Sequence, residues 1–133
     1  MKQPRISEIF GPTIQGEGAV IGEATIFVRT GGCDYRCSWC DTMHAVDPIH
    51  AKDWRAMSVE DICLAVNALT NGARTKPTIT LSGGNPAMQP LRETCQRLKS
   101  MGHRLIIETQ GTLIPDWLYI IDVISVSPKP PSA

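Results

Sequence analysis

Strand-like and helix-like segments alternate along the chain, and this alternation constrains the fold more than any other feature of the sequence. Apolar, β-branched runs predict strands at residues 24–30, 77–82, 103–109 and 120–127. Two segments whose apolar residues have helical spacing separate the first three runs. Strands that alternate with helices form parallel sheets with right-handed crossovers. We therefore expect an α/β fold with a parallel sheet.

The two helical segments have recognisable ends and apolar faces. Ser58 is a good N-cap for the first helix, with Asp61 three residues on as a capping-box-like partner. Gly102 is a natural stop for the second helix. Cys63 and Cys95 lie on the apolar faces of these helices and are expected to be small buried hydrophobes.

The remaining segments are expected to be irregular, apart from a short strand at residues 6–10. Residues 11–23 include four glycines and are expected to form a loop, and residues 43–57 have no regular pattern. Loops also follow the four expected parallel strands, at residues 31–42, 83–86, 110–111 and 128–131. Ligands bind beyond the carboxyl ends of parallel strands, so these four loops predict one shared site.

Size and charge limit the possible functions. The 133 residues suit a single domain covering 1–133. Thirteen basic and thirteen acidic residues give a formal net charge of zero, which does not favour nucleic-acid binding. No apolar run is long enough for a signal peptide or a membrane span. We therefore expect a cytoplasmic protein with reduced thiols and no membrane partner.

Three of the five cysteines lie within eight residues. Cys33, Cys37 and Cys40 have the spacing C-x3-C-x2-C, which favours a metal site over a disulfide framework. Three thiolates can bind three irons of a [4Fe–4S] cluster and leave the fourth iron without a protein ligand. The alternative is a zinc site in which His44 completes a Cys3His set.

Several short stretches follow one another in a specific order: PTIQGEG (12–18), FVRTGGC (27–33), CDT (40–42), SGGNPAMQ (82–89), ETQGT (108–112) and SPKPPS (127–132). Together with the cysteine triplet and the aromatic Trp39 before its last cysteine, they resemble the 7-carboxy-7-deazaguanine synthase family of the radical S-adenosylmethionine (SAM) superfamily. The resemblance implies a partial (β/α) barrel of the radical SAM type, of which this chain would be the N-terminal portion.

The resemblance also implies a reaction. Members of the family are carbon–nitrogen lyases that convert 6-carboxy-5,6,7,8-tetrahydropterin to 7-carboxy-7-deazaguanine, releasing ammonia, in queuosine biosynthesis. The implied cofactors are a [4Fe–4S] cluster, SAM and Mg²⁺. One electron from a flavodoxin- or ferredoxin-type donor would cleave SAM to methionine and a 5′-deoxyadenosyl radical, which removes the hydrogen at C6 of the pterin.

Roles for cofactor-binding residues follow from the same resemblance. Cys33, Cys37 and Cys40 would hold the cluster, and Thr42 would be a ligand of Mg²⁺, although alone it would be interpreted as a turn residue. The implied SAM-contacting positions are Trp39, Cys40, Asp41, Gly84, Asn85, Glu108 with Thr109 beside it, Ser127, Pro128 and Lys129. Ordinary core packing is the alternative for Trp39, and a solvated tail lysine is the alternative for Lys129.

Asn85 departs from the superfamily pattern. Superfamily members often have the sequence GGE where this chain has Gly83–Gly84–Asn85. An asparagine can still offer an oxygen to the SAM ammonium group, but it brings no negative charge. We therefore expect SAM affinity to depend more on other groups.

The substrate-binding positions implied by the resemblance are Ile14, Gln15, Gly16, Glu17, Arg29 and Ser82. An amide such as Gln15 can match both the donors and the acceptors of a pterin edge, and Glu17 could accept its N–H groups. The guanidinium of Arg29 suits a carboxylate. From the sequence alone, Arg29 could equally be a surface residue on an edge strand.

Members of the family continue past the SPKPPS stretch, so the sheet is expected to be truncated at its C-terminus and to end in an exposed edge. The chain would then be a fragment, a shortened homologue or a protein whose edge a partner covers, and a homodimer would provide such cover. Two other functions remain possible: another radical SAM enzyme, such as a glycyl-radical activase, and a zinc-stabilised binding domain without catalysis.

Overall fold

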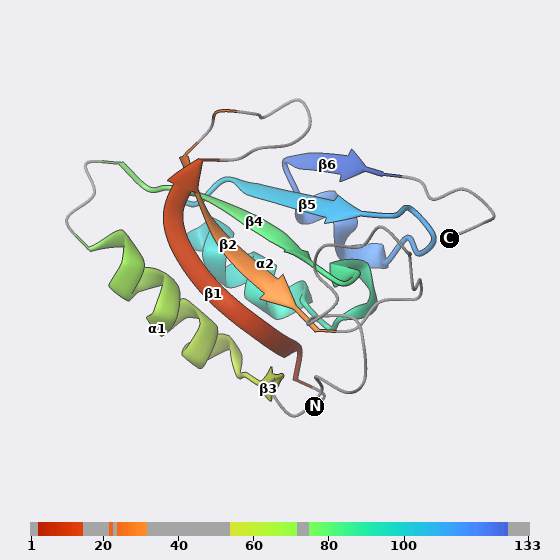
Figure 1. Ribbon diagram of the computed structural model, residues 1–133, viewed down its shortest axis with the longest axis horizontal. Helices are drawn as coiled ribbons and strands as arrows, with labels where there is room; N and C mark the ends of the chain where they lie inside the picture. The colour runs from red at the N-terminus through yellow and green to blue at the C-terminus, as the bar shows by residue number, and fades with distance from the viewer. Residues whose placement is uncertain (1–2, 15–21, 23, 32–53, 72–74, 128–133) are drawn as a thin grey trace.

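The computed structural model describes residues 3–14, 22, 24–31, 54–71 and 75–127. Its strands are β1 Arg5–Ile14, β2 Ala24–Thr30, β3 Arg55–Ala56, β4 Thr78–Gly83, β5 Leu105–Thr109 and β6 Val123–Val126. Its helices are α1 Val59–Thr70 and α2 Arg92–Ser100, with short 3-10 helices η4 Pro86–Met88 and η5 Asp116–Ile120. The strands form one sheet in the order β3-β1-β2-β4-β5-β6 (Figure 1).

The four predicted parallel strands are confirmed. β2, β4, β5 and β6 pair in parallel, and α1 and α2 form the crossovers between the first three. Apolar or β-branched side chains dominate these strands, as expected for buried parallel strands. The α/β class is therefore correct.

β1 differs from the sequence prediction. It runs through residue 14, although only residues 6–10 were expected to be a strand and residues 11–23 a loop, and it pairs antiparallel with β2. The pairing shifts between Phe10 and Thr13, which accommodates the turn-like sequence between them. Gly11 has φ +128°, and a Cβ there would lie 2.8 Å from the Thr25 carbonyl oxygen, so only glycine fits this close approach.

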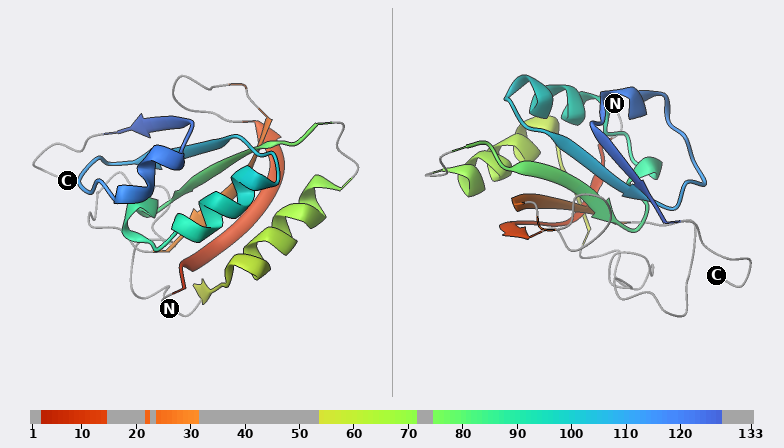
Figure 2. Two further views of the ribbon diagram at one scale, coloured as in Figure 1. Left: turned by 180° about the vertical axis from the view of Figure 1, so that it is seen from behind. Right: turned by 90° about the horizontal axis from the view of Figure 1, so that it is seen from above.

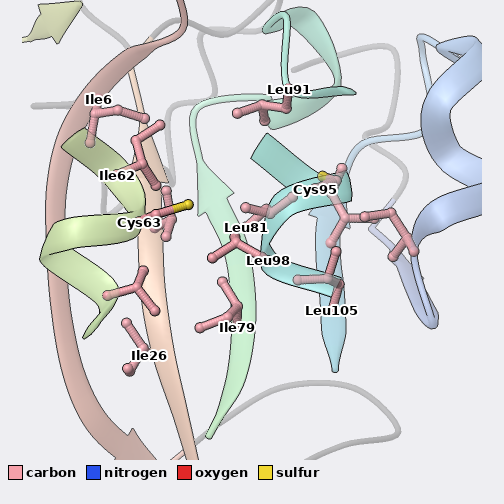
Figure 3. Close-up of a cluster of buried hydrophobic side chains, with 14 of the residues drawn as sticks. Ile6, Ile26, Ile62, Cys63, Ile79, Leu81, Leu91, Cys95, Leu98 and Leu105 are labelled. Carbon is pink, nitrogen blue, oxygen red and sulfur yellow. The ribbon is translucent and has the colours of Figure 1, made fainter. Parts of the chain in front are cut away.

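Helices α1, α2 and η5 lie on one face of the sheet (Figure 2). Side chains from this face and from the helices form the hydrophobic core (Figure 3). Its fully buried members include Ile6, Ile26, Val28, Ile62, Val66, Ile79, Leu81, Leu91, Leu98, Leu105 and Ile107. Among the described residues, no helix is long and apolar enough to cross a membrane.

Cys63 and Cys95 are free, buried cysteines of this core, as predicted. Burial raises the pKa of both thiols, that of Cys95 to about 12. These cysteines are therefore packing residues held in the thiol form.

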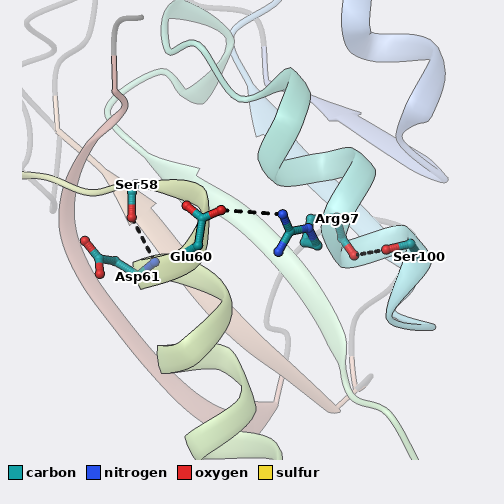
Figure 4. A network of polar contacts seen from close by, with 5 residues as sticks. All are labelled: Ser58, Glu60, Asp61, Arg97 and Ser100. Carbon is teal, nitrogen blue, oxygen red and sulfur yellow. Dashed lines mark hydrogen bonds and ion pairs between the residues drawn. The ribbon is translucent and has the colours of Figure 1, made fainter.

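The predicted helix boundaries also hold. The Ser58 hydroxyl accepts a hydrogen bond from the Asp61 amide at 3.1 Å (Figure 4). Gly102 follows α2 with φ +95°. An ion pair of 3.5 Å between Glu60 and Arg97 joins the two helices. Because both side chains are substantially exposed, this pair contributes little stability.

The structure contains a helix that the sequence analysis missed. Residues 116–120 form η5, and the last strand begins at Val123 rather than at residue 120. Trp117 of η5 is buried in the core, whereas Tyr119 is exposed. The apolar residues of this segment therefore belong to a short helix that packs on the sheet. Their composition is typical of a strand, and for this reason the sequence did not predict the helix.

Candidate active site

The sheet has a second face, opposite the helices, and this face is polar near the carboxyl ends of the parallel strands. In β2, the core residues Ile26 and Val28 alternate with Phe27 and Arg29, which point away from the core. In β4, Ile79 and Leu81 enter the core, and Thr80 and Ser82 point the other way. Arg29 and Ser82 are direct register partners on neighbouring strands.

Arg29 is held from the side by β1. Its Nη1 donates a hydrogen bond to Glu8 Oε1 at 2.7 Å, and its guanidinium carbon lies 5.3 Å from the centre of the Phe10 ring. Phe10 in turn stacks on Phe27, with 5.2 Å between the ring centroids. Arg29 is thus fixed by an ion pair and a cation–π contact on an interior strand, and it is not the edge-strand surface residue that the sequence allowed.

Two polar atoms on residues that are register partners have no hydrogen-bond partner among the described residues. They are Nε of Arg29 and Oγ of Ser82, and both atoms are buried. A buried donor without a partner costs about 1–3 kcal/mol, so native proteins rarely leave such groups unsatisfied without a functional reason. The pair is suited to binding an oxygen atom of a ligand.

The turn after β4 lies directly against the end of β2. Gly83 has φ +119°, and a Cβ on it would lie 2.2 Å from the Thr30 carbonyl oxygen. The next residue, Gly84, donates its amide hydrogen to the same oxygen at 3.2 Å. Glycine is required here because any side chain would push the two strand ends apart.

Asn85 follows this turn and is fully buried. Its Oδ1 accepts hydrogen bonds from the Ala87 amide at 3.2 Å and from the Thr109 hydroxyl at 2.9 Å. Its Nδ2 is 3.4 Å from the Thr112 hydroxyl. Asn85 therefore connects the end of β4 to the end of β5.

Glu108 and Thr109, which the sequence analysis placed together, face opposite ways. Thr109 continues the core-facing alternation of Leu105 and Ile107, and it is 5% exposed. Glu108 is half-buried on the other face, the face of Arg29, where Ser125 of β6 is its register partner. Ser127 donates its amide hydrogen to the Thr109 carbonyl at 2.9 Å, which brings the end of β6 to the same edge.

The structure does not bring Ile14 to this group. Ile14 pairs with Ala24, at the opposite end of β2 from Arg29, and it is 64% exposed. Ala24 and Arg29 are five residue steps apart along β2, a span of about 17 Å.

The other predicted site residues lie outside the described residues. They are Gln15, Gly16, Glu17, Cys33, Cys37, Trp39, Cys40, Asp41, Thr42, Pro128 and Lys129, with His44 of the zinc alternative. Within the part of the chain that is described, no group of three His, Cys, Asp or Glu side chains is placed to hold a metal ion. The metal sites therefore remain predictions from the sequence.

The start of the cysteine segment is nevertheless visible. Gly31, two residues before Cys33, is buried and follows β2 at the carboxyl edge. A Cβ on Gly31 would lie 2.4 Å from the Trp54 ring. Gly31 thus lies at the carboxyl edge beside the turn after β4.

Sequence reasoning missed Glu8, Phe10 and Gln89 as residues of this region. Gln89 Nε2 donates to the Gly31 carbonyl oxygen at 2.6 Å, and Gln89 Oε1 accepts from the Arg5 amide at 3.0 Å. No local pattern could reveal these contacts, because they join segments up to 84 residues apart.

A pocket of about 580 Å³ lies elsewhere, at the amino ends of α1 and α2. Its lining includes Met57, Ser58, Arg92 and Trp117, which belong to the helix face of the sheet. None of its lining residues has an unpartnered buried polar atom among those described. The unpartnered polar atoms of Arg29 and Ser82 therefore favour the carboxyl edge over this pocket as the candidate site.

Comparisons with known proteins show which proteins this chain is similar to. The model of the radical SAM superfamily matches residues 27–123. The 7-carboxy-7-deazaguanine synthase of Bacillus subtilis (strain 168) is 48% identical over 129 residues, which cover 96% of this chain and 52% of the relative. The enzyme of the same name from Halobacterium salinarum is 37% identical over 126 residues, covering 93% of this chain and 45% of that one. This chain therefore spans about half the length of these curated relatives.

The fold is shared with a solved structure. The crystal structure of QueE from Escherichia coli superposes with a TM-score of 0.80 at 29% sequence identity, over 97% of this chain and 61% of the other. The resemblance inferred from the short motifs is thus confirmed, as is the partial barrel it implied.

Proposed function

The chain belongs to the radical SAM superfamily, and from this premise we propose that it catalyses the 7-carboxy-7-deazaguanine synthase reaction. In this reaction, 6-carboxy-5,6,7,8-tetrahydropterin becomes 7-carboxy-7-deazaguanine and ammonia is released. The names of its relatives and the similarity of its fold to QueE support this lyase activity. This chain spans about half the length of these relatives.

The observation that carries the proposal is the pair of buried, unpartnered groups on Arg29 and Ser82. An anionic substrate with a carboxylate beside a polar ring would supply oxygen acceptors to both. Glu8 engages one nitrogen of the Arg29 guanidinium, so Nε remains available to the ligand. The stacked rings of Phe10 and Phe27 form an apolar wall beside the same guanidinium and would help to exclude water.

The donor set of the cysteine segment fits an iron–sulfur cluster. Cys33, Cys37 and Cys40 would hold it through three thiolates, which leaves one iron open. The SAM-facing residues would be Trp39, Asp41, Gly84, Glu108, Ser127, Pro128 and Lys129. The glycine turn at Gly83–Gly84, where a Cβ would collide with β2, offers bare backbone to a ligand. When bound, the iron–sulfur cluster and SAM would supply one-electron chemistry and the removal of a hydrogen atom from the substrate.

The chain's own residues would then position the pterin. Arg29 would bind its carboxylate, and the Ser82 hydroxyl would donate to a neighbouring oxygen. The loop residues Gln15 and Glu17 would match the donors and acceptors of the ring edge, together with Gly16. Because both Arg29 and Ser82 lie on interior strands of a packed sheet, their positions are fixed before the substrate arrives.

The test is product analysis with anaerobically reconstituted protein. The protein is incubated with SAM, dithionite and 6-carboxytetrahydropterin, and the products are separated and identified by mass spectrometry. We expect 7-carboxy-7-deazaguanine, and omission of the pterin should abolish it. SAM cleavage without this product would indicate a different radical SAM reaction, such as glycyl-radical activation. Colourless protein with one zinc per chain would instead indicate a binding domain.

Finer features are also proposals. Mg²⁺ would be bound through Thr42, and electrons would come from a flavodoxin- or ferredoxin-type protein, which implies a reducing, cytoplasmic location. Residues 1–133 would form one domain, and a homodimer would cover the β6 edge, where Ile124 and Val126 are 45% and 54% exposed. Sedimentation of the purified chain tests the dimer, and a monomer at micromolar concentration would exclude it.

A further inference from the structure

The turn between β4 and α2 carries two side-chain amides, one at each end of η4. We call the segment Asn85–Gln89 the amide clamp, because its two amides hydrogen-bond to parts of the chain that lie far away in sequence. The resemblance to known enzymes implies that Asn85 contacts SAM, and it implies no role for Gln89. The hydrogen bonds of the structure indicate a different division of work.

Gln89 uses both ends of its amide. Its Nε2 donates to the Gly31 carbonyl oxygen at 2.6 Å, and its Oε1 accepts from the Arg5 amide at 3.0 Å. Gly31 itself donates to the Arg5 carbonyl oxygen at 3.0 Å. One half-buried side chain therefore fixes the backbone two residues before Cys33 against both β1 and the turn after β4.

Asn85 uses its amide within the protein as well. Oδ1 accepts from both the Ala87 amide and the Thr109 hydroxyl, and the residue is fully buried. An amide oxygen has two lone pairs, and these two donors occupy both of them. The oxygen is thus engaged with the end of β5 and has no capacity left for an ammonium group.

We propose that Asn85 and Gln89 are positioning residues for the cofactors, a proposal that rests on the radical SAM function above. Gln89 would fix the start of the cysteine segment and so the approach of the cluster thiolates. Asn85 would fix the Gly83–Gly84 turn relative to β5 and so the backbone that faces SAM. Neither side chain would touch the cofactors, and each acts through the backbone that it holds.

The Gln89 arm is tested by the stability of the cluster in reconstituted holoprotein. Gln89→Met keeps the length of the side chain and removes both hydrogen bonds, and Gln96→Met, on the exposed face of α2, is the matched control. We expect iron release to a chelator to be about fivefold faster in the first variant, the factor expected from one net hydrogen bond. The control should behave as the wild type. Unchanged iron release from Gln89→Met would overturn this arm.

The Asn85 arm is tested by SAM affinity, measured by anaerobic titration calorimetry without reductant. Thr109→Val removes the hydroxyl that Asn85 accepts from, whereas Thr109→Ser keeps a hydroxyl at this position. We expect the dissociation constant of SAM to rise about fivefold in the valine variant and to be restored in the serine variant. A purely structural role would lower the thermal midpoint and leave the dissociation constant unchanged, and that result would overturn the proposal.

Asn85→Glu distinguishes most sharply between two interpretations of Asn85, a direct contact to SAM and a positioning residue. If Asn85 were a weak substitute for a SAM-binding glutamate, this change would tighten SAM binding. The proposal predicts weaker SAM binding, because a longer, charged side chain cannot accept hydrogen bonds from both the Ala87 amide and the Thr109 hydroxyl in the same buried position. Wild-type protein that takes up no cluster would overturn the proposed function and this inference together. Wild-type binding in all variants would overturn the inference alone.

Discussion

The two faces of the sheet differ in the side chains that they bury. On the helix face, β2 and β4 present Ile26, Val28, Ile79 and Leu81, which are completely buried in the core. On the opposite face, the same two strands present Arg29 and Ser82, each with a buried polar atom that has no partner among the described residues. Neighbouring positions in the chain therefore serve different purposes.

This difference shows where stability and function reside. Burial of apolar area stabilises the fold at about 25 cal/mol per Å², and the helix face contributes most of that burial. Unsatisfied buried donors reduce stability unless a ligand completes them. We infer that the helix face stabilises the sheet, whereas the opposite face lowers stability slightly in exchange for ligand binding. Substitutions on the helix face should therefore change stability, and substitutions on the opposite face should change ligand binding.

The largest effect is expected on the helix face. Leu81→Ala removes a side chain with no exposed surface and should lower the free energy of unfolding by about 2–5 kcal/mol. Leu64→Ala, at a position 67% exposed, should change it by less than about 0.5 kcal/mol. Urea unfolding followed by circular dichroism measures both. Equal effects of the two substitutions would contradict the assignment of the core.

The opposite face should respond in binding. Arg29→Lys keeps the positive charge and removes the unpartnered Nε together with the planar fork. The KM for the carboxylated pterin should rise about thirtyfold, corresponding to a loss of about 2 kcal/mol for a charged hydrogen bond. Unfolding free energy should change far less than in Leu81→Ala. A wild-type KM would show that Arg29 does not contact the substrate.

Ser82→Ala sharpens the same contrast with a smaller change. The hydroxyl makes no hydrogen bond to the described residues, so its removal should leave stability unchanged or raise it by up to about 1 kcal/mol. The KM should nevertheless rise about fivefold, because the substrate loses one hydrogen bond. Ser100→Ala on α2, whose hydroxyl bonds to the Arg97 carbonyl, is the control and should not change KM. Loss of stability without a change in KM would assign Ser82 to the fold instead.

Local patterns in the sequence predicted the helix face well. Apolar, β-branched runs identified the parallel strands, and helical spacing identified the two helices between them. Ser58 and Gly102 marked helix ends through backbone chemistry that depends on only a few neighbouring residues. The carboxyl-edge location of Ser82, Gly84 and Asn85 followed from the same topology. These features are predictable because each is encoded within a short stretch of chain.

The partners of the site residues were not predictable in this way. Arg29 is paired by Glu8 only because β1 runs antiparallel to β2 with a shifted register, and nothing local specifies that pairing. By residue type, Asn85 is suited to binding a ligand, but its Oδ1 already accepts a hydrogen bond from the Thr109 hydroxyl. Residue type therefore indicates which chemistry is available, whereas tertiary contacts decide which groups are already used.

The smallest expected effect concerns a polar group whose partners are all in the protein, in contrast to Arg29 and Ser82. Asp122, before β6, accepts from Lys99 at 2.6 Å through Oδ1 and from the Leu105 amide at 2.7 Å through Oδ2. Burial by itself raises the pKa of this carboxyl, but the hydrogen bonds from Lys99 and Leu105 outweigh it and lower the pKa below the ordinary 3.8.

Because the pKa of Asp122 is lower in the folded state, its contribution to stability is present above about pH 4 and is lost as the pH falls through the folded-state value. Asp122→Asn should therefore cost about 1 kcal/mol near neutral pH, where a partly exposed ion pair and one charged hydrogen bond are lost. The difference from wild type should be smaller at acidic pH, below about pH 4, than near neutral pH, because the advantage of the carboxylate is lost as it protonates in the folded state. Urea unfolding at both pH values measures it, with KM at neutral pH expected to stay at the wild-type value. A constant difference at both pH values would mean that Asp122 acts through packing and not through its charge.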